Sequence, residues 1–253
     1  MKKIALTSLV AMFAVSAANA ANIINDNPLY RPAAGHFYSI TDLTTDTSFE
    51  DPTWAIGETF GYGISDAWDV SVGTSVGSLL DDANWNGISL GTTYRFLNDA
   101  NWKADIIGGF NVANGWGGAV APGEWYEEES SFYTWTLGVR GGYVAEDWTL
   151  AAHFNYSYLN AEGFNWGDEG VREYEVGVDG QYIITDSWNL VAGVSYETID
   201  VPGADEMADG WTGRIGVNYN IDENMFVGVY AAHDLEFPDE AETQLGLKFG
   251  IDF

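Results

Sequence analysis

The chain has 253 residues, with 38 acidic against 9 basic side chains, a net charge of −29, no cysteine and 15% aromatic residues. This acidity excludes nucleic acid as a partner, because the phosphates would be repelled. The lack of cysteine excludes disulfides, thiol chemistry and lipoprotein anchoring, and the aromatic content argues against disorder.

Residues 1–20 have the pattern of a secretory signal peptide. Two lysines precede an apolar run from Ile4 to about Val15, and Ala18-Asn19-Ala20 is a small-x-small cleavage site. The run is too short for a membrane-spanning helix. We therefore expect export of the chain and cleavage after Ala20.

Residues 21–33, "ANIINDNPLYRPA", form the next segment. Pro28 and Pro32 cannot donate backbone hydrogen bonds to a sheet, so a strand is not expected here. We expect this segment either to fold into the interior of the following domain (residues 34–253) as a plug or to lie in the periplasm.

A repeated phrase runs through residues 34–253: an aromatic or apolar stretch, a short turn, then an aromatic or apolar residue that opens an alternating stretch. Asp, Asn and Ser favour turns because their side chains bond the local backbone. Apolar residues alternate with polar or small residues on both sides, which is the period of a β-strand. The five turns lie near Ser65–Ala67, Asn98–Asn101, Ala145–Asp147, Thr185–Ser187 and Asp222–Asn224.

Longer segments rich in Asp, Glu, Gly and Pro separate these turns. They lie at Thr45–Pro52, Leu80–Asn84, Asn114–Ser130, Asn160–Gly170, Val201–Asp209 and Glu236–Ala241. Short and long connections alternate, and five turns plus six loops give eleven connections. We predict an all-β, up-and-down antiparallel β-barrel of about twelve strands, with ten as the alternative.

Aromatic residues beside the short turns indicate that this barrel is transmembrane. On the apolar face they form the pattern of an interfacial girdle, and the opposite face is rich in glycine, which suits a tight interior. The girdle residues are Tyr62, Trp68, Tyr94, Trp102, Tyr143, Trp148, Tyr182, Trp188 and Tyr219.

The last strand, "TQLGLKFGIDF", places Leu245, Leu247, Phe249, Ile251 and Phe253 on one face. It resembles the C-terminal signature of bacterial outer-membrane β-barrel proteins, whose final aromatic residue is read by the barrel-insertion machinery. The resemblance extends to the signal peptide and to the alternation across the mature chain. It implies an outer-membrane barrel with long extracellular loops, short periplasmic turns and these five residues as its assembly signal. The implied partners are periplasmic chaperones, the barrel-assembly machinery, outer-membrane lipids and lipopolysaccharide.

Charged residues on the inward face predict a network in the lumen. Opposite charges in a narrow interior should pair, because an isolated charge there is costly. The network is interpreted either as bracing or as a charge-selective constriction. Its predicted members are Arg95, Lys103, Asp105, Arg140, His153, Glu173, Glu175, Asp179, Glu197, Arg214 and Lys248.

Glu58 breaks the alternation, because it shares the apolar parity of Ile56 and Phe60. A carboxylate facing lipid is costly. We expect a β-bulge near Gly57 to turn it inward, with a protomer interface as the alternative.

No catalytic motif stands out, so an enzyme is not expected. His233-Asp234 with Asp81-Asp82 faintly resembles the acid–histidine sites of omptin surface proteases, but those barrels have ten strands and place the pair differently. The acidic stretches Glu124–Ser130 and Gly203–Gly210 lack the spacing of a calcium loop. No cofactor is expected, although divalent cations could bridge these loops to lipopolysaccharide.

The function predicted from these features is a narrow, porin-like channel for ions or small polar solutes. Acidic loops concentrate cations over about a Debye length, ~8 Å at physiological salt, so a cation preference that weakens with salt is expected. Neutralising Glu127, Glu128 and Glu129 should reduce it. The alternative is a non-conducting surface barrel serving adhesion, envelope integrity or omptin-like proteolysis.

Overall fold

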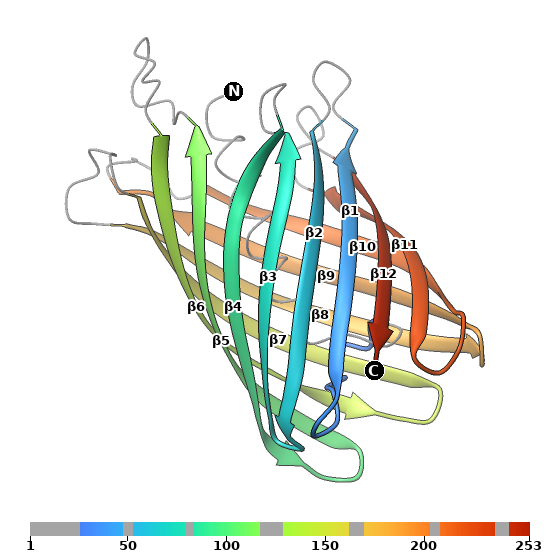
Figure 1. The fold of residues 1–253 in the computed structure, drawn as a ribbon. Helices are drawn as coiled ribbons and strands as arrows, with labels where there is room; N and C mark the ends of the chain where they lie inside the picture. Colours follow the sequence, from blue (N-terminus) through green and yellow to red (C-terminus); the bar gives the residue numbers. More distant parts are fainter. Residues whose placement is uncertain are drawn as a thin grey trace.

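A computed structural model describes residues 26–47, 53–78, 83–116, 129–161, 170–202, 208–235 and 243–253. These residues form twelve strands (Figure 1). The strands are β1 (Phe37–Asp46), β2 (Trp54–Ser65), β3 (Trp68–Ser78), β4 (Ala83–Asn98), β5 (Trp102–Trp116), β6 (Glu129–Val144), β7 (Trp148–Ala161), β8 (Val171–Thr185), β9 (Trp188–Asp200), β10 (Ala208–Asn220), β11 (Met225–Asp234) and β12 (Thr243–Asp252).

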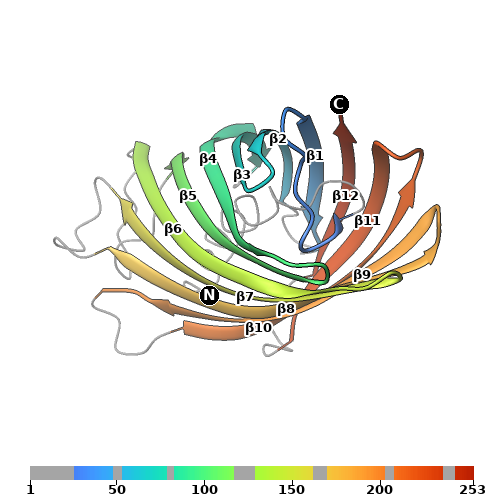
Figure 2. The same cartoon turned by 90° about the horizontal axis from the view of Figure 1, so that it is seen from below.

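Each strand pairs antiparallel with its neighbours in the chain, and β1 pairs with β12 to close the barrel. Figure 2 shows the resulting ring of strands. Closure leaves no unpaired sheet edge. The prediction of an all-β, twelve-stranded antiparallel barrel is therefore confirmed. Within the described parts of the chain, no helix is long and apolar enough to cross a membrane.

The five short turns lie at the same end of the barrel as the C-terminus (Figure 1). Their polar side chains bond the local backbone as expected: Asp99 Oδ1 accepts from the Ala100 amide at 2.8 Å, and Asp222 Oδ1 accepts from the Asn224 amide at 2.8 Å. The connections at the opposite end, where the sequence predicts long loops, lie largely outside the described residues.

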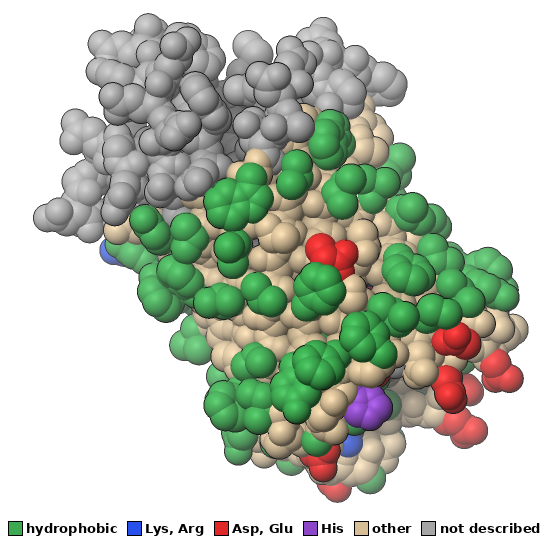
Figure 3. Space-filling model, viewed as in Figure 1, with side chains coloured by type: hydrophobic (Ala, Val, Ile, Leu, Met, Phe, Trp, Pro, Cys, Tyr) green, Lys and Arg blue, Asp and Glu red, His purple; other side chains and the backbone are tan. Residues whose placement is uncertain are grey.

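The outer face of the barrel is apolar and the inner face is polar. Leu137 on β6 is 61% exposed, whereas the inward Asn218 on β10 is 2% exposed. Hydrophobic side chains accordingly cover much of the surface in Figure 3. A water-soluble barrel would bury this face, so the pattern is that of a transmembrane barrel.

The aromatic residues predicted for the girdle lie on the outer face at the short-turn ends of their strands. Several pack against each other across neighbouring strands. The ring centroids of Trp102 and Tyr143 are 5.2 Å apart, those of Tyr143 and Trp148 are 5.4 Å apart, and those of Trp188 and Tyr219 are 4.9 Å apart.

Inward glycines make room for large side chains in the lumen. The ring of Tyr38 lies over Gly61, and the ring of Phe226 lies over Gly250, so closely that a Cβ at either glycine would collide with the ring. Tyr38 and Phe226 are both fully buried. They fill the interior beside the β1–β12 seam.

The predicted bulge at Gly57 is wrong. Gly57 pairs in regular register with Asp42 on β1 and with Ser75 on β3. Glu58 therefore keeps its outward direction, and its carboxylate accepts hydrogen bonds from the hydroxyls of Ser39 and Thr41. These two outward hydroxyls satisfy the carboxylate, so no rearrangement of the backbone is needed.

Candidate functional site

Residues 26–33, which we call the lumen segment, run through the interior of the barrel. Asp26 forms an ion pair with Lys248 of β12, with Nζ 2.9 Å from Oδ1, and both side chains are buried. Asn27 Nδ2 donates to the Thr149 hydroxyl of β7 at 2.9 Å. The segment is thereby attached to opposite parts of the wall.

Tyr30 attaches the middle of the lumen segment to β12. Its hydroxyl donates to Asp252 Oδ2 at 2.8 Å. Burial, reinforced by this hydrogen bond and by the charge of Asp252, raises the pKa of the Tyr30 phenol, which therefore remains a donor.

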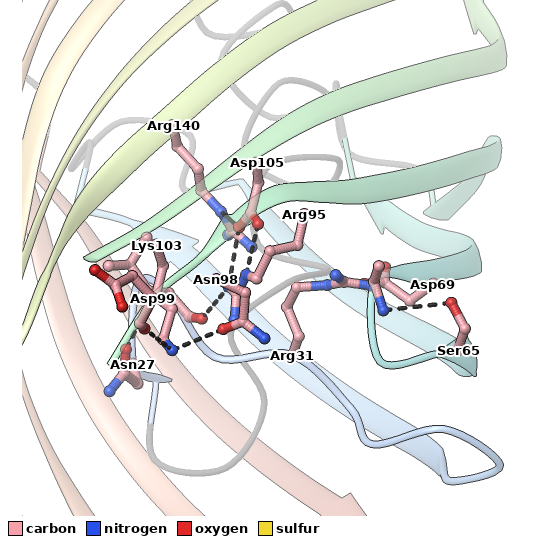
Figure 4. Close-up of polar contacts among 12 residues, drawn as sticks. Asn27, Arg31, Ser65, Asp69, Arg95, Asn98, Asp99, Lys103, Asp105 and Arg140 are labelled. Atoms are coloured by element: carbon pink, nitrogen blue, oxygen red, sulfur yellow. Dashed lines mark hydrogen bonds and ion pairs between the residues drawn. The ribbon is translucent and has the colours of Figure 1, made fainter. Parts of the chain in front are cut away.

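An arginine cluster continues from the segment into the wall (Figure 4). We define it as Arg31, Asp69, Arg95, Asp105 and Arg140. Arg31 Nε lies 2.5 Å from Asp69 Oδ2. Asp105 forms ion pairs with two arginines: Arg95 Nε lies 2.8 Å from Oδ1, and Arg140 Nε lies 2.8 Å from Oδ2.

The arginine cluster also holds the segment's backbone, because Arg95 Nη2 donates to the Leu29 carbonyl at 2.6 Å. The side chains in these ion pairs are only 0–9% exposed. Buried charges of this kind are tolerated when they are paired. The interior is thus tightly filled near the short-turn end.

A histidine cluster on β7, β8 and β10 is more open. His153 lies between two carboxylates, with Nε2 3.4 Å from Glu175 Oε1 and Nδ1 3.0 Å from Asp179 Oδ2. Arg214 Nη2 is 3.5 Å from Asp179 Oδ1. Exposure of these side chains is 16–24%, so water reaches this part of the lumen.

Glu173 and Glu197, which we call the carboxylate pair, point inward near the long-loop ends of β8 and β9. Glu173 is 3% exposed. Its Oε2 and the Oε1 of Glu197 are buried and accept no hydrogen bond from the residues that the structure describes. The structure does not bring these two residues into an ion pair with any described basic side chain.

Lys103, predicted for the lumen network, serves a different purpose. Its Nζ donates to Asn98 Oδ1 at 2.7 Å and to the Asp99 carbonyl at 2.6 Å (Figure 4). Lys103 is the second residue of β5, so it lies at the rim of the barrel and braces the turn between β4 and β5.

Several important lumen residues were not predicted. Asp69 and Asp42 have inward parity, which could have identified them; Asp42 accepts from the Tyr230 hydroxyl at 3.1 Å. Asp26 and Arg31 lie outside any strand, so no alternation pointed to them.

His233 and Asp234 do not face each other. His233 is exposed on the outer parity, with Nδ1 2.8 Å from the Thr243 hydroxyl, whereas Asp234 accepts from the Thr212 hydroxyl at 3.0 Å. Consecutive strand residues point to opposite faces. Asp81 and Asp82 lie outside the described residues, as do Glu127, Glu128 and the side chain of Glu129.

No group of three or more His, Cys, Asp or Glu residues that could hold a metal ion occurs in the part of the chain that the structure describes.

The predicted assembly-signal residues line the outer face of β12, with Leu245, Leu247 and Phe249 exposed. Phe253 also takes part in closure. Its backbone amide and carbonyl each form a 2.8 Å hydrogen bond with Phe37 at the start of β1.

Comparison with known proteins agrees with this architecture. The 31 kDa outer-membrane immunogenic protein of Brucella melitensis is 24% identical over 250 residues, covering 87% of this chain and 99% of its own length.

Solved structures share the fold at low sequence identity. The NanC porin matches with a TM-score of 0.59 and 8% identity, over 84% of this chain and 98% of its own. An outer membrane channel from Pseudomonas putida F1 matches with a TM-score of 0.56 and 13% identity, over 87% and 96%.

A family model described as TonB dependent receptor-like, beta-barrel matches residues 15–242. This match covers most of the chain and extends through β11. The chain therefore belongs to the TonB dependent receptor-like β-barrel family and is a bacterial outer-membrane β-barrel protein.

Proposed function

We propose that this barrel is a narrow channel for ions or small polar solutes, with cation preference, and that the lumen segment holds it in a weakly conducting state. The observation that carries the proposal is the contrast within the lumen. The side chains of the histidine cluster are 16–24% exposed, whereas those of the arginine cluster are 0–9% exposed.

Cation preference follows from the charges on the inward face of β7–β10. Glu173, Glu175, Asp179 and Glu197 are acidic there, against the bases His153 and Arg214. A lumen lined mainly by one sign of charge enriches the opposite ion. The NanC porin and the Pseudomonas putida channel share the fold, which is compatible with conduction.

The decisive test is planar-bilayer conductance of the mature chain and of a variant lacking residues 26–33. We expect small, cation-preferring steps from the intact chain and larger steps from the variant. Because the chain has no cysteine, the double variant N27C/T149C provides a matched control. Joining its thiols with a short crosslinker should fix the segment in place and keep conductance low, and leaving them reduced should give the behaviour of the intact chain.

A second candidate is a non-conducting surface barrel. The buried ion pairs of the arginine cluster favour it, since they fill the interior near the short turns. Absence of conductance from both the intact chain and the variant without the segment, with correct folding shown by heat-dependent gel migration, would overturn the channel proposal in favour of this one.

A further inference from the structure

The carboxylate pair is short of counter-charge. Glu173 Oε2 and Glu197 Oε1 are buried, yet within the described parts of the chain neither oxygen accepts a hydrogen bond. The charged neighbours that act on Glu173 are themselves acidic, namely Glu197 and Glu175. An unsatisfied buried carboxylate oxygen is costly, more so next to like charges.

The nearby bases are already engaged elsewhere. His153 is held between Glu175 and Asp179, and Arg214 also lies against Asp179. Glu175 is further satisfied by Asn155, whose Nδ2 donates to it at 2.8 Å. The carboxylate pair therefore has two free acceptor oxygens, which a cation with hydrogen-bond donors would satisfy.

The register places the two carboxylates within reach of a single bound group. Glu197 lies opposite Glu175, and Glu173 lies opposite Ile199, so the pair is diagonal on neighbouring strands. Diagonal positions are separated by about 7–8 Å at the backbone, and long side chains span this gap. Glu197 is more exposed than Glu173. A solute in the lumen would therefore reach Glu197 before Glu173.

The chemistry of the surroundings selects the ligand. The described residues offer no cluster suited to a metal ion, whereas a primary ammonium carries three N–H donors and can serve both free oxygens. Apolar side chains flank Glu173: Val171 on the same face of β8, and Ile199 directly across on β9. An alkyl chain attached to the ammonium would lie against them.

We propose that the carboxylate pair is a binding site for a primary alkylammonium ion, the charged end of a solute such as an alkyl diamine. This inference rests on the proposed function, since it names the class of solute that the channel takes. The ammonium sits between Glu173 and Glu197 and donates to both, and the alkyl chain lies along Val171 and Ile199.

The test is isothermal titration of the detergent-solubilised barrel with 1,5-diaminopentane. The variant E173Q/E197Q removes both charges and should weaken binding at least tenfold. The matched control D200N/D209N removes two acids from the outer face at the same end of β9 and β10 and should bind like the parent chain. Glu173→Lys supplies an internal ammonium and should abolish binding in a folded barrel, which guards against a loss caused by misfolding.

Two further probes test what the site recognises. One carries positive charge without N–H donors, and the other carries the alkyl chain without charge. Tetramethylammonium, which has no N–H donor, and neutral 1,5-pentanediol should bind at least tenfold more weakly than the diamine. Equal binding by E173Q/E197Q, or equal competition by magnesium ions, would overturn the proposal, as would lack of binding by the parent chain.

Titration does not require conduction, so a conducting barrel that fails to bind the diamine would refute only the site. A non-conducting barrel that binds it would refute only the channel.

Discussion

Replacing Lys248 by methionine should release the lumen segment. Lys248 is buried, and its Nζ lies 2.9 Å and 3.2 Å from the two carboxylate oxygens of Asp26. Methionine fills a similar volume without the charge, so the buried Asp26 would lose its ammonium partner, with the charge of Arg214 still acting on it. Because Asp26 belongs to a segment outside the sheet, it can escape this penalty by leaving the lumen while the barrel stays closed.

The size of the effect follows from the burial of the pair. Removing one partner of a buried ion pair costs about 3–5 kcal/mol. Since about 1.4 kcal/mol changes an equilibrium constant tenfold, the balance between the seated and the released segment should shift about 10²- to 4 × 10³-fold toward release. The remaining anchors, namely Asn27, Tyr30, Arg31 and the Leu29 carbonyl, oppose that shift. The charge of Arg214, which acts on Asp26, offsets part of it.

Two measurements check this prediction: single-channel conductance, and access of a protease to the segment in the folded barrel. Both should increase in Lys248→Met. Lys103→Met, which removes a lysine that bonds Asn98 and the Asp99 carbonyl beside the β4–β5 turn, should leave both unchanged. Unchanged conductance and unchanged protease resistance in Lys248→Met would show that the ion pair does not hold the segment.

Three further predictions concern stability and assembly. Asp105→Asn leaves two buried arginines without their shared carboxylate and should lower the free energy of unfolding by about 3–5 kcal/mol, measured by urea titration of tryptophan fluorescence; a change near zero would contradict the network. Gly61→Ala should cost about 1–3 kcal/mol in the same assay, because its Cβ collides with the ring of Tyr38, and pairing it with Tyr38→Leu should recover most of the loss. Deleting Phe253 should reduce the amount of membrane-inserted protein, measured by heat-dependent gel migration of membrane fractions, and normal insertion would count against its role in assembly.

The sequence alone determined the barrel and its two faces. Alternation with a period of two reports directly which side of a strand each residue occupies, and the turn residues mark where each strand ends. The strand number, the closed antiparallel order and the inward direction of Arg140 and Lys248 could therefore be predicted. These properties depend on local patterns that the chain carries at each position.

Only the tertiary structure decided what each inward charge contacts. Asp26 pairs with Lys248, which is 222 residues away in the sequence. The alternating pattern of the strands does not extend into the segment that contains Asp26. Glu58 was expected to turn inward, because its outward parity would place a carboxylate against lipid. The sequence pattern does not show the two hydroxyls of β1 that lie beside this carboxylate and donate to it. Partners in the lumen depend on barrel closure and on the path of a segment without regular structure, and both arise only when distant parts of the chain come together.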